Sequence, residues 1–162
     1  MKIIPVINIR FRYAVPSDVP LLRNFESKLV AHERSVEPTL IQKGSLEYYK
    51  IPDLIGDENA SILIAEVDGV PIGCGLGQIK ENDFYNNEKQ YGYIGLMYVE
   101  ESQRGKNIGG LIIQELMDWF GTKGINEIRL KVYASNPMAV EAYKKYGFEH
   151  YVHDMKLKKD TI

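Results

Sequence analysis

Apolar and polar residues alternate along this chain with two different periods, and these periods predict strands and helices. Residues 8–14 alternate as in a strand, whereas residues 16–34 place an apolar residue at every third or fourth position, which indicates a helix. Ser17 or Asp18 can cap this helix, and Pro20 suits its first turn. Its apolar stripe consists of Leu22, Phe25 and Leu29.

The rest of the chain continues to alternate between the two periods. Residues 44–57 indicate a second, shorter helix. Residues 60–80 indicate a hairpin, because Asp68-Gly69 is a strong two-residue turn signal between two apolar runs. Further strands are expected at residues 91–100, 127–134 and 148–158, and further helices at residues 107–124 and 136–147. The order βααβββαβαβ predicts an α/β (α+β) domain with one mixed sheet, covering residues 1–162.

Composition is that of a soluble globular protein, and it excludes several functions. The 162 residues suit a single domain with a full core, and the net charge of −2 gives no electrostatic case for a nucleic-acid partner. Cys74 is the single cysteine, so an internal disulfide is excluded, and the three histidines lack metal-ligand spacing. Residues 1–16 are too short and too charged to span a membrane, and they lack a signal-peptide cleavage pattern. We therefore expect a cytoplasmic protein with no metal and no membrane partner.

A basic, glycine-containing turn lies between a predicted strand and a predicted helix. The start of a helix offers unpaired backbone N–H groups and a partial positive charge. Gly105 lets a ligand approach that backbone closely, and Arg104 and Lys106 add full positive charges. These features favour a site for phosphate or pyrophosphate, with a solvated loop as the alternative. The turn is not a P-loop, because Asn107 follows the lysine where a P-loop has Ser or Thr.

A second glycine-rich stretch, residues 73–77 (GCGLG), invites comparison with a dinucleotide-binding fingerprint. It lies in the second arm of the predicted hairpin, and no helix follows it. We interpret its glycines as marking a twisted strand or one that another element approaches closely.

Two motifs give the chain a resemblance to a known family. Residues 104–109 (RGKNIG) resemble the R/Q-x-x-G-x-G/A segment with which GCN5-related N-acetyltransferases (GNATs) bind acetyl-CoA. Residues 136–148 resemble the family's second signature, N-x-x-A-x-x-x-Y-x-x-x-G-F. The order of elements resembles the GNAT fold from about residue 8 onward, and residues 32–40 (HERSVEPTL) are similar to a poorly defined bacterial branch of the family.

The resemblance implies an acetyl-CoA-dependent N-acetyltransferase in which an amine attacks the thioester directly. Backbone groups of the strand before the turn would grip the pantetheine and polarise the thioester carbonyl, which a bulge in that strand would permit. Tyr143 would protonate the leaving thiolate as general acid, with a core aromatic residue as the alternative. The implied cofactor-binding residues are Met97, Tyr98, Val99, Arg104, Gly105, Lys106, Asn107, Ile108, Gly109, Gly110, Asn136, Tyr143 and Lys145.

The general base is not implied by the resemblance alone. Some family members have a glutamate six residues before the position of Val99, where this chain has Tyr93. Tyrosine is a poor base near neutrality, so Tyr93 is expected to hold a water that relays the proton. Glu81, Asp83 and direct transfer to bulk water are the alternatives.

The acceptor site is expected in the first two helices and the loop between them. Glu33, Glu37 and Glu47 are candidates to meet a cationic amine there, and Tyr48 and Tyr49 are candidates to line its apolar part. This acidic and aromatic character favours a small molecule or an amino-acid derivative. A protein N-terminus or lysine is an alternative acceptor.

One position departs from the family pattern. Asn107 stands where the family usually has glycine, but asparagine keeps the backbone N–H and tolerates the left-handed conformation. We therefore expect the phosphate site to be retained. A non-catalytic acyl-CoA-binding regulatory module and a nucleotide-binding protein are alternative functions, and exposed sheet edges are compatible with a homodimer.

Overall fold

The structure is a computed structural model that describes residues 8–161. The chain divides into two compact units, Met1–Lys131 and Val132–Ile162. The first unit holds the sheet and most of the helices, and the second holds one helix and the C-terminal segment. The single domain over residues 1–162 stays a prediction.

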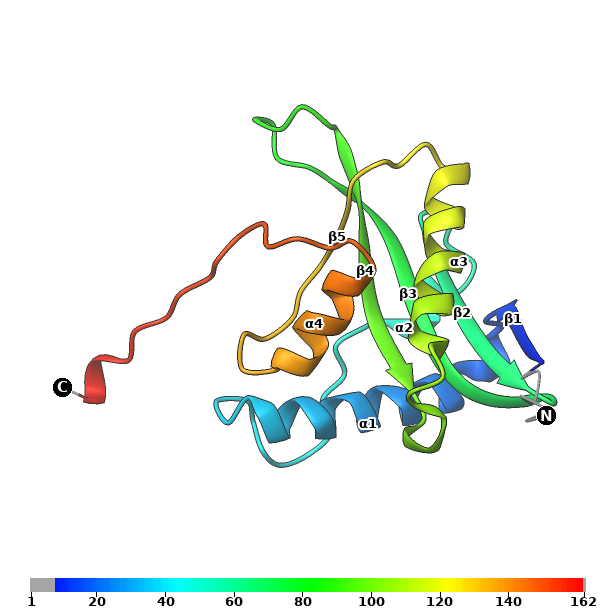
Figure 1. The fold of residues 1–162 in the computed structure, drawn as a ribbon, viewed down its shortest axis with the longest axis horizontal. Coiled ribbons are helices and arrows are strands. Elements are labelled where there is room, and N and C mark those ends of the chain that lie inside the picture. The colour runs from blue at the N-terminus through cyan, green and yellow to red at the C-terminus, as the bar shows by residue number, and fades with distance from the viewer. Residues whose placement is uncertain (1–7, 162) are drawn as a thin grey trace, which may run out of the picture. The chain divides into compact units, whose positions relative to one another are not determined.

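The first unit contains a mixed sheet, as the sequence predicts, and this sheet has five strands (Figure 1). Its strands follow one another in space in the order of the sequence. The first four pair antiparallel, and the fifth pairs parallel to the fourth. Their bounds are β1 (Ile9–Tyr13), β2 (Ala60–Val67), β3 (Val70–Glu81), β4 (Gln90–Val99) and β5 (Ile128–Leu130).

The helices of the first unit are α1 (Val19–Val36), α2 (Ile51–Leu54) and α3 (Ile108–Thr122), with the short 3₁₀ turns η1 (Pro16–Asp18) and η2 (Glu101–Gln103). Helices α1 and α3 cover opposite faces of the sheet. Successive side chains of a strand point to opposite faces, so neighbouring residues of β3 show which helix covers each face. Cys74 and Leu76 of β3 belong to the core cluster that contains Phe25 of α1. Gly75 faces the other way, toward Ile112 of α3.

The glycine-rich stretch of β3 is a close approach between strand and helix, as predicted. A Cβ atom added at Gly75 would lie 2.5 Å from Cγ2 of Ile112 and 2.9 Å from Sδ of Met97. A Cβ added at Gly77 would lie 3.1 Å from Cζ of Phe120. These glycines let α3 lie against the sheet, so they do not form a dinucleotide-binding turn.

The predicted hairpin turn and the predicted ends of the last helix are also present in the structure. Asp68 and Gly69 both have positive φ, 51° and 74°, as a two-residue type I′ hairpin turn requires. In the second unit, α4 (Pro137–Lys145) begins with the side chain of Asn136 accepting a hydrogen bond from the backbone N–H of Ala139 at 3.3 Å. Gly147 follows this helix with φ of 93°.

Three predicted elements differ from the structure. The helix expected at residues 44–57 is reduced to α2, because a buried carboxylate binds the backbone just before it, as described below. The strand expected at residues 127–134 is confined to β5. Residues 149–158 form no strand, and the second unit ends with the 3₁₀ turn η3 (Lys159–Thr161). A strand needs a paired neighbour, and an alternating pattern does not specify one.

None of the helices in residues 8–161 is long and apolar enough to cross a membrane. In α3, Ile108, Ile112 and Leu116 are buried, whereas Leu111, at a similar helical spacing, is exposed. The buried face instead extends to Ile113. This leaves the start of α3 firmly held against the sheet, next to the basic turn.

Candidate functional site

Strand β4 contains a bulge at Leu96 and Met97. Leu76 of β3 is paired with Gly95 and Cys74 with Tyr98, so two residues of β4 oppose one residue of β3. Leu96 has a φ of 47°, which is unusual for a residue other than glycine.

The same strand has an open edge on its other side. Pairing with β5 covers only three residues of β4 and ends at Ile94. Beyond the bulge, the backbone of Met97, Tyr98 and Val99 therefore has no partner strand on the β5 side among the described pairs. A bulge with an open edge lies where the resemblance requires backbone groups for a thioester.

Arg104 folds back onto the end of β4. Its Nε donates to the carbonyl oxygen of Val99 at 3.1 Å, and its guanidinium carbon lies 5.8 Å from the ring centre of Tyr98. The Tyr98 hydroxyl donates to Glu100 at 3.2 Å, and Lys28 donates to the same carboxylate at 2.5 Å. Burial and the nearby carboxylate raise the pKa of Tyr98, so this phenol stays protonated near neutrality.

The basic turn has a left-handed backbone conformation at two of its residues. Gly105 has φ of 79° and Asn107 has φ of 59°, so the asparagine takes the left-handed conformation expected of it. The N–H of Leu111 donates to the carbonyl of Asn107, which leaves the N–H groups of the three preceding residues directed out of the helix end.

The space in front of this helix end fits an anionic cofactor. A Cβ added at Gly109 would meet no atom of the described chain within 4 Å. Exposed Lys106, held by Gln103 at 2.9 Å, adds positive charge beside Arg104. The residues present therefore fit the phosphates of acetyl-CoA, with the open edge of β4 continuing from the same site.

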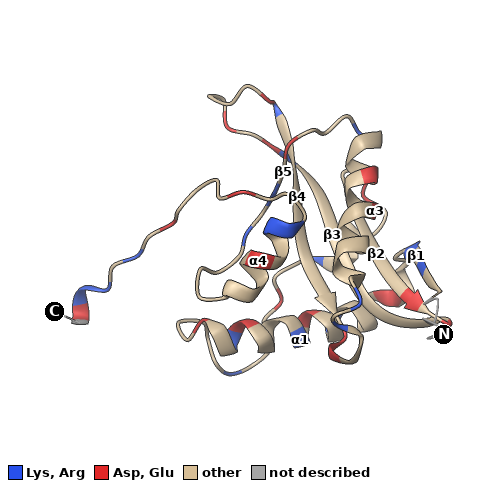
Figure 2. Ribbon diagram, viewed as in Figure 1, with Lys and Arg blue, Asp and Glu red and all other residues tan. Residues whose placement is uncertain are grey.

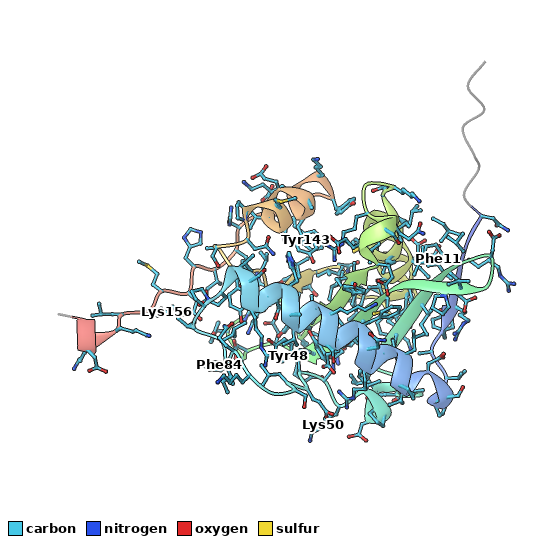
Figure 3. All side chains as sticks on the ribbon, turned by 90° about the horizontal axis from the view of Figure 1, so that it is seen from below. Phe11, Tyr48, Lys50, Phe84, Tyr143 and Lys156 are labelled. Carbon is cyan, nitrogen blue, oxygen red and sulfur yellow. The ribbon has the colours of Figure 1, made fainter. Side chains whose placement is uncertain are left out.

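Glu26 organises the segment opposite β4, and the sequence analysis did not single it out. This carboxylate is only 1% exposed. One oxygen accepts the backbone N–H groups of Tyr48 and Tyr49 at 2.8 and 3.1 Å, and the other binds Arg23 at 2.7 Å. Arg23 also donates to the carbonyl of Tyr49 at 2.9 Å. The backbone of residues 48–49 is thus fixed alongside α1 (Figure 3).

Tyr49 connects this segment to the bulge. Its hydroxyl accepts a hydrogen bond from the backbone N–H of Leu96 at 3.2 Å and is hydrogen-bonded to Tyr93. Gly95 provides the room, because a Cβ there would lie 2.4 Å from the Tyr49 hydroxyl oxygen. Burial raises the pKa of Tyr49 well above its usual range, and burial also raises that of Tyr93. Neither phenol is a base near neutrality.

Glu33 completes the group on the α1 side. It is half-buried, it is hydrogen-bonded to Tyr48, and its negative charge acts on Tyr49 and Tyr93. Burial raises its pKa, which the hydrogen bond from Tyr48 partly offsets. The structure therefore brings together Glu33, Tyr48, Tyr49 and Tyr93 of the predicted site.

The other candidate residues have hydrogen-bond partners outside this group. Glu37 accepts the backbone N–H and hydroxyl of Thr39 within its own turn. Glu81 accepts from Gln90 at 2.7 Å. Asp83 accepts from the Tyr85 hydroxyl at 2.9 Å, and both alternative bases are exposed.

The second unit carries the remaining predicted residues on or next to α4. Tyr143 is half-buried, with its ring edge-on to Phe148 at a centroid distance of 5.9 Å. Asn136 caps the helix, and Lys145 is exposed in its last turn. The described residues hold no cluster of His, Cys, Asp and Glu that could bind a metal ion.

Comparison with known proteins connects these features to a family. A sequence model described as the acetyltransferase (GNAT) family matches residues 28–148, which include the bulged strand, the basic turn and α4. N-alpha-acetyltransferase 30 of Saccharomyces cerevisiae is 30% identical over 79 residues, which are 49% of this chain and 43% of that protein. The match therefore spans less than half of that relative.

Solved structures share the fold at low sequence identity. A mutant of protein BH1408 from Bacillus halodurans has a TM-score of 0.82 at 18% identity, covering 92% of this chain and 98% of that one. A predicted acetyltransferase from Clostridium acetobutylicum, solved with acetyl-CoA, has a TM-score of 0.70 at 20% identity, covering 95% and 98%. An aminoglycoside acetyltransferase from an uncultured soil metagenomic sample has a TM-score of 0.66 at 15% identity, covering 93% and 97%.

Proposed function

Because the chain belongs to the acetyltransferase (GNAT) family, we propose that it is an acetyl-CoA-dependent N-acetyltransferase acting on a primary amine of a small molecule or amino-acid derivative. One observation carries the proposal: the bulged, open-edged end of β4 runs directly into a left-handed basic turn at the start of α3. That one continuous stretch of backbone can hold both the thioester and the phosphates of acetyl-CoA.

The cofactor side is assigned residue by residue. When bound, acetyl-CoA supplies the acyl group as a thioester. Backbone N–H groups of Met97 and Val99 would hold the pantetheine and polarise the carbonyl oxygen as negative charge develops there. The turn from Arg104 to Gly110 would hold the phosphates through its cations and the N–H groups at the helix start. Asn136 and Lys145 are proposed as further cofactor contacts.

The acceptor side must both hold and deprotonate an amine. An alkyl ammonium group has a pKa of roughly 10, so it must lose a proton before it can attack. The carboxylate of Glu33 would attract the ammonium form, with Tyr48 lining the site and Glu37 adding negative charge nearby. A water held at Tyr93 would accept the proton, because the phenol itself remains protonated.

Tyr143 is proposed to donate a proton to the departing thiolate. Tyr143→Phe is then expected to lower kcat strongly while leaving acetyl-CoA affinity near the wild-type value. The assay follows release of the CoA thiol with a panel of primary amines. Unchanged kcat with the best acceptor would remove Tyr143 from this role.

A protein N-terminus is the second candidate acceptor. It is favoured by the partial match to N-alpha-acetyltransferase 30, over a stretch that includes less than half of that protein. A panel containing both free amines and short peptides decides between the two acceptors. Binding of acetyl-CoA without turnover of any amine would instead favour the non-catalytic regulatory module.

A further inference from the structure

One face of the sheet continues past the group formed by Glu33, Tyr48, Tyr49 and Tyr93. Gln78 of β3 is paired with Tyr93 of β4, and Tyr93 is paired with Arg129 of β5, so these three share a face. Lys80 lies two residues beyond Gln78 of β3, on the same face, and Lys131 lies two residues beyond Arg129, just after the end of β5. Figure 2 marks basic residues in blue along β5.

Lys80 lies directly over Tyr93. Its ammonium nitrogen is 4.1 Å from the centre of the tyrosine ring, and the side chain is half-buried. Burial lowers the pKa of Lys80, and the positive charge of Lys131 lowers it further.

Within the described part of the chain, no carboxylate forms an ion pair that compensates the charges of Lys80 and Lys131. Arg129 on the same face is already engaged: it pairs with Glu127 and lies over Tyr91 at 4.0 Å. Two repelling lysines without an acidic partner leave a position that an anion would stabilise.

Tyr93 therefore has opposite charges on its two sides. Its hydroxyl end is hydrogen-bonded to Tyr49 and lies in the field of Glu33, whereas the ammonium of Lys80 lies over its ring. We propose that Lys80 and Lys131 form an anion subsite for the carboxylate of the acceptor, so that the preferred acceptor is an α-amino acid with its amino group toward Glu33. This inference rests on the proposed acetyl transfer.

The reaction that follows is balanced within the assigned residues. The amino group loses one proton through the water at Tyr93, and its nitrogen forms the C–N bond as the thioester C–S bond breaks. The thiolate takes a proton from Tyr143, and the nitrogen loses its second proton as the amide forms, which restores the Tyr143 phenol. The product is an N-acetyl amino acid that keeps its carboxylate. A peptide N-terminus has this carboxyl converted to an amide, so it is expected to behave like an amino-acid carboxamide.

The test compares carboxylates with matched neutral compounds. Standard α-amino acids and their carboxamides are assayed as acceptors with wild type, Lys80→Gln, Lys131→Gln and Lys80→Arg. Lys123→Gln is the control, because its ammonium also lies by an aromatic ring, 6.0 Å from the centre of Trp119 on α3. Wild type is expected to prefer the amino acids over their carboxamides. Lys80→Gln is expected to lower that preference at least about tenfold, because a charge-assisted hydrogen bond to the carboxylate is lost.

Lys80→Arg is expected to keep most of the preference and Lys123→Gln all of it. Equal use of amino acids and carboxamides by the wild type would overturn the anion subsite, and so would an equal loss for both in Lys80→Gln. A peptide used better than every free amino acid would overturn it in favour of a protein acceptor.

Binding of the products separates this inference from the proposed function. N-acetyl amino acids and their carboxamides are titrated calorimetrically, which requires no turnover. Product binding that requires both the carboxylate and Lys80 supports the anion subsite, even if no amine is acetylated. In that case only the proposed acetyl transfer is overturned. Turnover without a preference for carboxylates overturns the anion subsite but not acetyl transfer. Absence of both turnover and carboxylate-dependent binding overturns the anion subsite and the proposed function together.

Discussion

The backbone N–H of Leu96 donates to the hydroxyl of Tyr49 at 3.2 Å, which joins the segment before α2 to the bulge of β4. Leu96 is almost fully buried and holds a φ of 47°, a conformation that costs a residue other than glycine about 1–3 kcal/mol. The hydrogen bond occupies an N–H group that the bulge takes out of the regular ladder. The bulge and the segment before α2 therefore stabilise each other.

Tyr49→Phe tests this connection. Loss of the hydroxyl is expected to lower the free energy of unfolding by about 0.5–1.5 kcal/mol. It is also expected to lower kcat more than the affinity for acetyl-CoA, because the backbone that polarises the thioester is less fixed. Urea denaturation and steady-state kinetics measure the two effects. Tyr13→Phe, on an exposed tyrosine of β1, is the control and should change neither.

Gly95→Ala tests the same contact from the other side. The new methyl group would lie 2.4 Å from the Tyr49 hydroxyl oxygen, so the tyrosine must move or the strand must shift. Overpacking of this kind costs typically about 1–3 kcal/mol of stability. Thermal unfolding measures it, and stability equal to wild type would show that Tyr49 is not confined as described.

Gly109→Ala is expected to separate stability from cofactor binding. An added Cβ at this position meets nothing within 4 Å, and alanine favours a helix over glycine by up to about 1 kcal/mol. Stability should therefore stay equal or rise, whereas acetyl-CoA affinity should fall about tenfold or more because the methyl group occupies the space for the phosphates. Calorimetric titration measures the affinity, and undiminished binding would place the phosphates elsewhere.

The acid side of the pH–rate profile should report Glu33. Burial raises its pKa, so the carboxyl becomes neutral, and stops attracting an ammonium group, at a pH above the ordinary glutamate value of about 4.3. The kcat/KM for the acceptor should rise with pH through this raised pKa. Glu33→Gln should lower kcat/KM and remove that rise. An identical acid limb in both proteins would assign it to another group.

Features set by neighbouring residues are well predicted from the sequence. The Asp68-Gly69 turn, the cap at Asn136 and the left-handed Asn107 each depend on a few adjacent positions, and all three are present. Their conformations follow from local sterics and hydrogen bonding.

Features that depend on distant contacts are not predicted. Glu26 lies in a polar-looking stretch of a helix, and only the fold shows that its carboxylate is buried and binds the backbone 22 and 23 residues away. The positions of Tyr49 and Lys80 relative to Tyr93 depend likewise on segments that are remote in sequence. For the same reason, the alternation in residues 148–158 indicated a strand that the structure does not contain.

Thermal unfolding with and without acetyl-CoA tests the central claim most directly. At about a hundred times the dissociation constant, a ligand that binds only the folded state adds roughly 2.7 kcal/mol, which for a chain of this size raises the Tm by about 5–10 °C. We predict a rise of this order with acetyl-CoA, none with ATP, and a reduced rise in Gly109→Ala. No rise at saturating acetyl-CoA, or an equal rise with ATP, would contradict the assignment of this site to an acetyl-CoA-dependent enzyme.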